Sequence, residues 1–337
     1  MNLDQLATVA RAMVADNKGL LAADESTGTI GKRLDSINVE STEETRRDYR
    51  EMLFRAEGLG NYISGVILYD ETIRQSAADG TPLTKLLEEQ SILPGIKVDT
   101  GAKALAGSED EKITEGLDGL RDRVDEYVKL GAKFAKWRAV ITIGDNMPSL
   151  YCIDTNAHAL GRYARICQEG GLVPIVEPEV LMDGAHTLDR CAEVTELTLQ
   201  RTFVELLDQG VALEGMILKP NMVISGTDCA DQADLDTVAN RTVASLRRAV
   251  PAAVPGIMFL SGGQSEADAS AHLNAMNAIN HVLPWALSYS YGRALQASAL
   301  KVWGGNNSNN GAAQARLLER SRLNSAACAA QYTEEAA

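Results

Sequence analysis

The stretch LVPIVEPE, at residues 172–179, is a short apolar run with glutamates at positions 177 and 179. Its Leu, Val and Ile residues show no polar alternation, and this pattern predicts a strand that is buried on both faces. Seven similar runs occur along the chain, and longer stretches with helical periodicity separate them. In chain order, the eight runs are GLLAAD (19–24), YISGVILY (62–69), GIKVD (95–99), FAKWRAVI (134–141), LVPIVEPE (172–179), LEGMILK (213–219), GIMFLSG (256–262) and ALSYSYG (286–292).

The stretches between the runs carry helix signals. Ser41 and Glu44 have the spacing of a capping box ahead of an amphipathic segment. Apolar residues recur at spacings of three and four over residues 117–128, where Gly131 has the position of a C-terminal cap, and over residues 235–246. Eight strands that alternate with helices predict a (β/α)8 TIM barrel, and an open doubly wound sheet is the alternative.

We expect one α/β domain over residues 1–337, because no linker or change in composition divides the chain. Residues 1–18 are predicted to form an extra N-terminal helix, and residues 305–337 a C-terminal helical segment with a truncated tail. No apolar stretch is long enough for a membrane span, and the N-terminus lacks the features of a secretory signal. The five cysteines form no C-x-x-C pair, so we expect reduced thiols in a cytoplasmic protein.

The net charge of −14 disfavours nucleic acid and anionic membranes as partners, because an acidic protein repels both at long range. An anionic substrate would therefore need cations gathered in one place. In a TIM barrel that place is the C-terminal end of the strands. Charged or polar residues lie at or just after the ends of seven predicted strands, and those from 97 to 261 are spaced 39 to 42 residues apart: Asp24, Lys97, Lys136, Glu177, Lys219, Ser261 and Arg293.

Strand alternation adds two residues to this group. Side chains two positions apart on a strand share a face, so Arg138 is expected beside Lys136, and Glu179 beside Glu177. The mouth of the barrel is therefore predicted to combine several cations with several carboxylates, which indicates a site for an anionic substrate.

Lys219 follows an apolar run and precedes Pro220, which favours an extended backbone at the lysine. An amine attacks a ketone only as the neutral base, and apolar surroundings together with a cation such as Lys136 favour that form. We therefore expect Lys219 to form a Schiff base. Asp24 and Glu177 are the candidates for the proton transfers that Schiff-base formation and bond cleavage require.

Two glycine-rich segments, SGGQS (261–265) and YGRA (291–294), follow the seventh and eighth predicted strands. Phosphate sites of such barrels often form there, because glycines let backbone N–H groups approach the phosphate oxygens and Arg293 can bind them in bidentate fashion. A second phosphate site is expected across the mouth, in ESTGTIGKR (25–33). Its candidate residues are Ser26, Thr29, Lys32 and Arg33.

Neither a metal nor another cofactor is expected. The histidines show neither an i, i+4 pair nor an H-E-x-x-H motif, which disfavours a zinc-dependent carbon–carbon lyase. The four histidines are His158, His186, His272 and His281.

Eight ordered motifs, spread from about residue 18 to residue 333, resemble the class I fructose-bisphosphate aldolases, with the animal-type branch as the nearest match. The resemblance implies a TIM barrel that cleaves fructose 1,6-bisphosphate reversibly through a lysine Schiff base, in a metal-independent, cytosolic and usually tetrameric enzyme. The motifs are LAADESTGTIGKRL, GVILYDETI, GIKVDTG, FAKWR, VPIVEPE, LKPNMV, FLSGGQSE and SYGRALQASALKVWGG.

By this resemblance, Lys219 matches the Schiff-base lysine, and Glu177 and Asp24 match the residues that transfer protons. Lys136 matches a lysine that assists Schiff-base formation, and Glu179 is a further catalytic candidate on the strand face of Glu177. The expected substrate-binding residues are Ser261, Gly262, Gly263, Ser290, Gly292 and Arg293 at one phosphate, Ser26, Thr29, Lys97 and Arg138 near the other, and Arg33.

The chain departs from the animal-type pattern in two places. Thr100 replaces a lysine, and Tyr332, near the final residues AAQYTEEAA, matches an earlier tyrosine rather than the terminal one that aids proton transfer. Three alternatives remain: fructose 1-phosphate as the substrate, a transaldolase-like Schiff-base lyase, and a sugar-phosphate-binding protein without turnover. Two phosphate sites disfavour the second alternative, and the trio of Lys219, Glu177 and Asp24 disfavours the third.

Overall fold

Eight parallel strands form a closed barrel in the computed structural model, which describes residues 2–279 and 282–333. The strands are β1 (Gly19–Ala23), β2 (Ile63–Leu68), β3 (Leu93–Lys97), β6 (Phe134–Ile141), β7 (Val173–Val180), β8 (Ile217–Leu218), β9 (Gly256–Phe259) and β10 (Ala286–Tyr291). Around the barrel they follow the order β1-β10-β9-β8-β7-β6-β3-β2. The predicted TIM barrel is therefore confirmed, and the open sheet is excluded.

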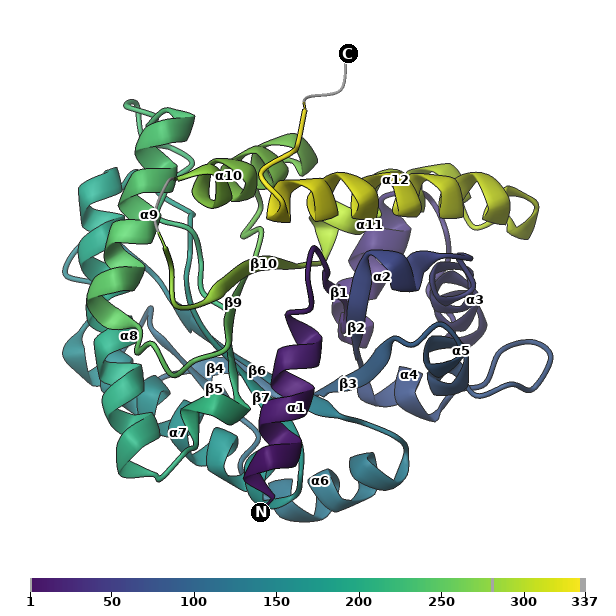
Figure 1. The fold of residues 1–337 in the computed structure, drawn as a ribbon, viewed down its shortest axis with the longest axis horizontal. Coiled ribbons are helices and arrows are strands. Elements are labelled where there is room, and N and C mark those ends of the chain that lie inside the picture. The colour runs from purple at the N-terminus through teal and green to yellow at the C-terminus, as the bar shows by residue number, and fades with distance from the viewer. Residues whose placement is uncertain (1, 280–281, 334–337) are drawn as a thin grey trace.

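Helices surround the barrel, and further helices lie near both ends of the chain (Figure 1). None of the helices that the structure describes is long and apolar enough to cross a membrane. The α-helices are α1 (Leu3–Met13), α2 (Thr27–Asp35), α3 (Glu43–Phe54), α4 (Asp70–Arg74), α5 (Leu83–Glu89), α6 (Leu120–Lys129), α7 (Leu150–Glu169), α8 (Leu188–Asp208), α9 (Leu235–Ala249), α10 (Glu266–Ala278), α11 (Arg293–Trp303) and α12 (Asn310–Cys328). Short 3-10 helices are η1 (Leu59–Asn61), η2 (Leu213–Gly215) and η3 (Asn307–Asn309).

The N-terminal end of the barrel is filled with apolar side chains and covered by α1. Alternate strand residues point inward, and Leu20, Ile67, Phe134 and Ile217 pack there with residues of α1. Figure 1 shows α1 lying across this part of the barrel. The ring of Phe134 occupies space that Gly95 leaves free, since a Cβ on Gly95 would lie 2.1 Å from the ring.

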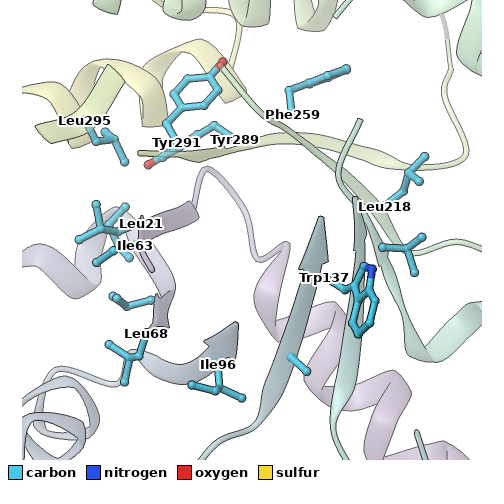
Figure 2. Close-up of a cluster of buried hydrophobic side chains, with 14 of the residues drawn as sticks. Leu21, Ile63, Leu68, Ile96, Trp137, Leu218, Phe259, Tyr289, Tyr291 and Leu295 are labelled. Carbon is cyan, nitrogen blue, oxygen red and sulfur yellow. The ribbon is translucent and has the colours of Figure 1, made fainter. Parts of the chain in front are cut away.

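The intervening strand residues point outward and form the larger hydrophobic core between the barrel and the helices. Trp137, Leu218 and Tyr291 belong to this core, and Figure 2 shows them on separate strands around the barrel. Trp137 stacks on Tyr163 of α7 with ring centroids 5.5 Å apart. Because both strand faces are buried, the strands appear in the sequence as continuous apolar runs.

The sixth predicted strand is shorter than its apolar run. Only Ile217 and Leu218 form strand β8, and residues Leu213–Gly215 turn as η2. The backbone N–H of Lys219 still donates to the carbonyl of Val176 at 2.8 Å. Lys219 therefore continues the line of β8 beyond its formal end.

The predicted capping box of Ser41 and Glu44 is wrong, because the cap lies one residue later. The Thr42 hydroxyl accepts a hydrogen bond from the N–H of Thr45 at 3.1 Å, and the Thr45 hydroxyl accepts one from the N–H of Thr42 at 2.9 Å. The Thr45 hydroxyl thus accepts the hydrogen bond from the N-cap backbone that a glutamate was expected to accept. The other helix predictions are confirmed: α6 ends just before Gly131, whose φ is +100°, and α9 covers the second periodic segment.

One element outside the barrel was not predicted. Strands β4 (Gly101–Ala104) and β5 (Lys112–Glu115) form an antiparallel hairpin between β3 and α6. The helices expected within residues 1–18 and 305–337 are present as α1 and α12, while residues 334–337 of the predicted tail lie outside the described residues. The backbone N–H of Tyr332 donates to the Asn274 side chain of α10 at 2.9 Å.

Candidate active site

The strand-end residues meet around one cavity of about 600 Å³ at the C-terminal end of the barrel. Lys136 and Arg138 continue the inward-facing series that begins with Phe134, and so enter the cavity above the apolar layer. All of the site residues predicted from the sequence except Lys32 line it: Asp24, Lys136, Glu177, Glu179 and Lys219; Ser26, Thr29, Arg33, Lys97 and Arg138; and Ser261, Gly262, Gly263, Ser290, Gly292 and Arg293.

A continuous chain of charges crosses the floor of the cavity. The Lys219 Nζ lies 3.1 Å from one oxygen of Glu177, and the Lys136 Nζ lies 3.0 Å from the other. Lys136 also contacts an Asp24 oxygen at 3.0 Å. The side chains of the two lysines and of Glu177 are at most 6% exposed, so these charges interact with little screening by solvent.

Burial and neighbouring charges have opposite effects on the pKa values of these three groups, Asp24, Glu177 and Lys136. Burial acts to raise the pKa of Asp24, but Lys136, Lys219 and Lys97 outweigh it and lower that pKa to about 2. Burial likewise acts to raise the pKa of Glu177, and the nearby cations again lower it. Burial acts to lower the pKa of Lys136, yet the facing carboxylates raise it above its ordinary value. Both carboxyl groups are therefore ionised around a protonated Lys136.

A second set of charges lies beside the first. Lys97 contacts Asp99 at 2.8 Å, and the other Asp99 oxygen accepts from the backbone N–H of Arg138 at 3.2 Å. The Arg138 guanidinium forms an ion pair with buried Glu179. Burial acts to lower the pKa of Arg138, but Glu179 raises it above its ordinary value. Glu179 therefore holds the guanidinium at the cavity wall.

The loops after β9 and β10 form a glycine-rich part of the wall. Gly262 and Gly263 have φ values of +63° and +117°, which side-chain-bearing residues rarely adopt. Ser290 is 1% exposed, and its hydroxyl has no hydrogen-bond partner in the described structure. A buried hydroxyl without a partner in a cavity wall can bind an oxygen of an anion.

Two arginines flank these loops. The Arg293 guanidinium comes within 3.1 Å of the position that a Cβ on Gly263 would occupy. The Arg33 guanidinium comes within 3.7 Å of a Cβ placed on Gly292. Glycines at these two positions leave room for arginine side chains, so cationic and backbone donors converge on one region of the cavity.

The segment 25–33, expected as an anion-binding loop, is mostly helical. Ser26 caps α2 by accepting from the N–H of Thr29 at 3.4 Å, and the two hydroxyls lie 3.1 Å apart. Both residues line the cavity, as does Arg33, whereas Lys32 of the same segment is not part of the lining. Helical spacing explains the difference, because Ser26, Thr29 and Arg33 share one face of α2.

Several lining residues were missed in the sequence. Glu25 forms an ion pair with Arg33 and accepts a hydrogen bond from Gln296 at 3.1 Å, but as a carboxylate it was not a candidate in the segment expected to bind an anion. Met182 and Thr227 come from the loops after β7 and β8, where the N–H of Thr227 donates to the Met182 carbonyl at 2.9 Å. The spacing of residues in the sequence does not predict such loop residues, because a backbone hydrogen bond between two distant loops brings them to the cavity.

Within the described ranges 2–279 and 282–333, no three His, Cys, Asp or Glu residues are grouped so that they could hold a metal ion. The five cysteines, all of which the structure describes, are unpaired. The arrangement can instead supply an amine nucleophile, ionised carboxylates as proton acceptors, and donors for anionic groups.

Comparison with known proteins identifies a family whose members share this sequence and fold. A family model described as "Glycolytic: Fructose-bisphosphate aldolase class-I" matches residues 5–337. A "Probable fructose-bisphosphate aldolase class 1" of Xylella fastidiosa is 57% identical over 333 residues, covering 98% of this chain and 99% of that protein.

Relatives from eukaryotes are similar to nearly the same extent. "Fructose-bisphosphate aldolase 6, cytosolic" of Arabidopsis thaliana is 53% identical and covers 99% of this chain and 93% of its own length. The solved structure of fructose-bisphosphate aldolase from Plasmodium falciparum, in complex with TRAP and a small-molecule inhibitor, superimposes with a TM-score of 0.97. It is 49% identical and covers 99% of this chain and 96% of its own.

Proposed function

The chain belongs to the class I fructose-bisphosphate aldolases, and we propose that Lys219 is the residue that forms the Schiff base with the ketone of the substrate. The enzyme is a glycolytic lyase that reversibly cleaves fructose 1,6-bisphosphate into dihydroxyacetone phosphate and glyceraldehyde 3-phosphate. The observation that carries the assignment is the position of Glu177, which bridges Lys219 at 3.1 Å and Lys136 at 3.0 Å.

Glu177 is suited to the first proton transfers. It is ionised, lies 3.1 Å from the Lys219 Nζ, and can take up the proton that the amine must lose before it attacks C2 of the substrate. The carbinolamine that results must lose its hydroxyl as water. Glu177 then carries the proton that this departure requires, and returns to the ionised form.

Asp24 is suited to the cleavage step. Once the iminium has formed on Lys219, it accepts the electron pair of the C3–C4 bond, and the C4 hydroxyl must give up its proton as the bond breaks. A carboxyl group with a pKa of about 2 is ionised at neutral pH and can take this proton. Lys136 stays protonated between Asp24 and Glu177 and orients both.

Two groups of donors are assigned to the two phosphates. The loops 261–263 and 290–293 offer backbone N–H groups, the unpaired Ser290 hydroxyl and Arg293, and Arg33 flanks them. Ser26, Thr29, Lys97 and Arg138 line the cavity and are assigned to the other phosphate. Binding at both ends fixes the reacting carbons over Lys219.

The enzyme acts on sugar phosphates, and we assign it a cytosolic location and a homotetrameric state. The first assignment is supported by plant relatives that are named cytosolic or cytoplasmic at 53% and 54% identity. The second is supported by apolar side chains that are more than half exposed, Tyr151 on α7 and Val204 and Leu207 on α8, because such groups are often covered by a partner. Light scattering coupled to size-exclusion chromatography measures the oligomeric state.

Trapping of the covalent intermediate tests the proposed function directly. Borohydride reduction in the presence of fructose 1,6-bisphosphate should attach the substrate to Lys219, as mapped by peptide mass spectrometry. Lys219→Arg keeps the charge and should abolish both the adduct and the activity. Lys301→Arg, at an exposed lysine of α11, is the matched control and should behave as the unmodified enzyme. An adduct on another lysine, or activity without any adduct, contradicts the assignment.

A further inference from the structure

The loop after β9 turns sharply, and a side chain behind it holds its backbone. The carbonyl of Ser261 accepts hydrogen bonds from the backbone N–H and from the side-chain Nε2 of Gln264, each at 3.0 Å. Gly262 and Gly263, which line the cavity, lie between these residues. Gln264 itself does not line the cavity, and its Nε2 lies 3.6 Å from the sulfur of buried Met222.

Gln264 is held in turn by a histidine. The Nδ1 of His272, on α10, lies 2.6 Å from the Oε1 of Gln264. Because the Gln264 amide nitrogen donates to Ser261, its oxygen faces His272 as an acceptor, and the His272 Nδ1 must therefore carry a proton. Burial lowers the pKa of His272, although Asp268 opposes this shift. The ring is thus neutral at physiological pH, with its single proton on Nδ1.

These contacts determine the direction in which one backbone N–H points. The carbonyl of Ser261 and the N–H of Gly262 belong to the same planar trans peptide and point in opposite directions. Holding the carbonyl against Gln264 therefore directs the Gly262 N–H away from Gln264, which does not line the cavity, whereas Gly262 does. A flip of this peptide changes the φ of Gly262, and a glycine offers little resistance to that change, so an external restraint is needed.

We propose that Gln264 and His272 are positioning residues, which keep the Ser261–Gly262 peptide oriented so that its N–H is available to a substrate phosphate. Neither side chain touches the substrate in this scheme; His272 fixes the amide of Gln264, and Gln264 fixes the peptide. The inference rests on the proposed function, because it takes the loop 261–263 as part of a phosphate site.

Steady-state kinetics on His272→Ala and Gln264→Met tests this. Each variant should raise KM for fructose 1,6-bisphosphate, and Ki for inorganic phosphate, by about tenfold, the usual effect of losing one hydrogen bond to a charged group. The turnover number should stay within about twofold, because the groups at the reacting carbons are untouched. His272→Asn should behave as wild type, since its side-chain N–H can donate from the place of Nδ1.

His158→Ala is the matched control, since His158 also makes a single side-chain contact, to Glu205 at 3.0 Å, on the exposed surface of α7.

Arg293→Ala distinguishes a failure of the phosphate site from a failure of the positioning role. If Arg293→Ala leaves Ki for phosphate unchanged, the phosphate assignment itself fails. If Arg293→Ala weakens phosphate binding while His272→Ala and Gln264→Met keep wild-type constants, the positioning role is overturned. If KM and Ki for phosphate are raised as much in His272→Asn as in His272→Ala, the role of His272 is overturned. Should His272→Ala not fold, Gln264→Met, which keeps the packing volume, decides alone.

Discussion

Lys136 lies between Asp24 and Glu177, with its Nζ 3.0 Å from an oxygen of each carboxylate. One cation therefore contacts both carboxylates, and Lys219 is the only other cation within 4 Å of Glu177 in the described residues, so two lysines face two carboxylates. The arrangement explains how Asp24 and Glu177 stay ionised although little solvent reaches them, as the proposed proton transfers require.

Removing the cation should therefore destabilise the fold. Lys136→Met keeps the length of the side chain but leaves two buried carboxylates without their shared partner. We expect the free energy of unfolding at neutral pH to fall by about 3–5 kcal/mol, measured by urea denaturation. Lys301→Met, at an exposed position on α11, should change it by less than about 0.5 kcal/mol. Equal effects of the two substitutions would contradict the role assigned to Lys136.

Lowering the pH should reduce the free energy of unfolding by the amount that ionised Asp24 contributes. The Asp24 pKa is about 2 in the folded protein, against an ordinary value of 3.8. A lowered carboxyl pKa contributes stability that is fully present above pH 4 and is lost as the pH falls toward 2, and the shift corresponds to about 2 kcal/mol. The stability difference between wild type and Asp24→Asn should shrink over this window in urea titrations at successive pH values. A difference that grows on acidification would refute the sign.

The two ends of the cavity should respond differently to substrates with one or two phosphates. Arg138→Ala and Arg293→Ala should each lower kcat/KM for fructose 1,6-bisphosphate by about 10- to 100-fold, through the loss of a charge-assisted contact. Only one of them should have a comparable effect on fructose 1-phosphate, because that substrate leaves one end empty. Arg162→Ala, at an exposed arginine of α7 outside the cavity lining, is the control. Identical profiles for both cavity variants would show that the two arginines serve a single phosphate.

Gly95→Ala tests the packing below the cavity. A Cβ at this position would lie 2.1 Å from the ring of Phe134, so we expect a loss of about 1–3 kcal/mol in the free energy of unfolding. Phe134→Leu in the same chain should restore part of that loss, because it vacates the space. Gly311→Ala, in α12, meets no atom within 4 Å and should be neutral or slightly stabilising. A destabilisation that Phe134→Leu deepens would rule out this contact as the cause.

Sequence patterns predict the site well where it depends on regular strands. Lys136 and Arg138 share a face because side chains on a strand alternate, and barrel closure then brings residues from separate strands together. The same reasoning places Glu177 and Glu179. These rules are local or follow from topology, so they need no knowledge of loop conformation.

Other features depend on contacts that no local pattern reveals. The hairpin of β4 and β5 is an insertion after β3, and Met182 and Thr227 reach the cavity through pairing between two loops. The contact of His272 with Gln264 joins a helix to a turn through a single hydrogen bond. A histidine without a motif is uninformative in the sequence, since its partner is chosen by packing.

The helix α1 and the apolar layer around Phe134 close one end of the barrel, so the cavity lies at the C-terminal end of the strands. With Lys219 as the proposed Schiff-base residue, the half of the sugar bound to it stays in the cavity until that covalent bond is hydrolysed, while the other half is free to leave once the carbon–carbon bond has broken. The proposed covalent bond therefore imposes an order of departure: the aldehyde leaves first, and the ketone phosphate follows. In the synthetic direction the sequence of arrivals is reversed, and the ketone phosphate must enter before the aldehyde.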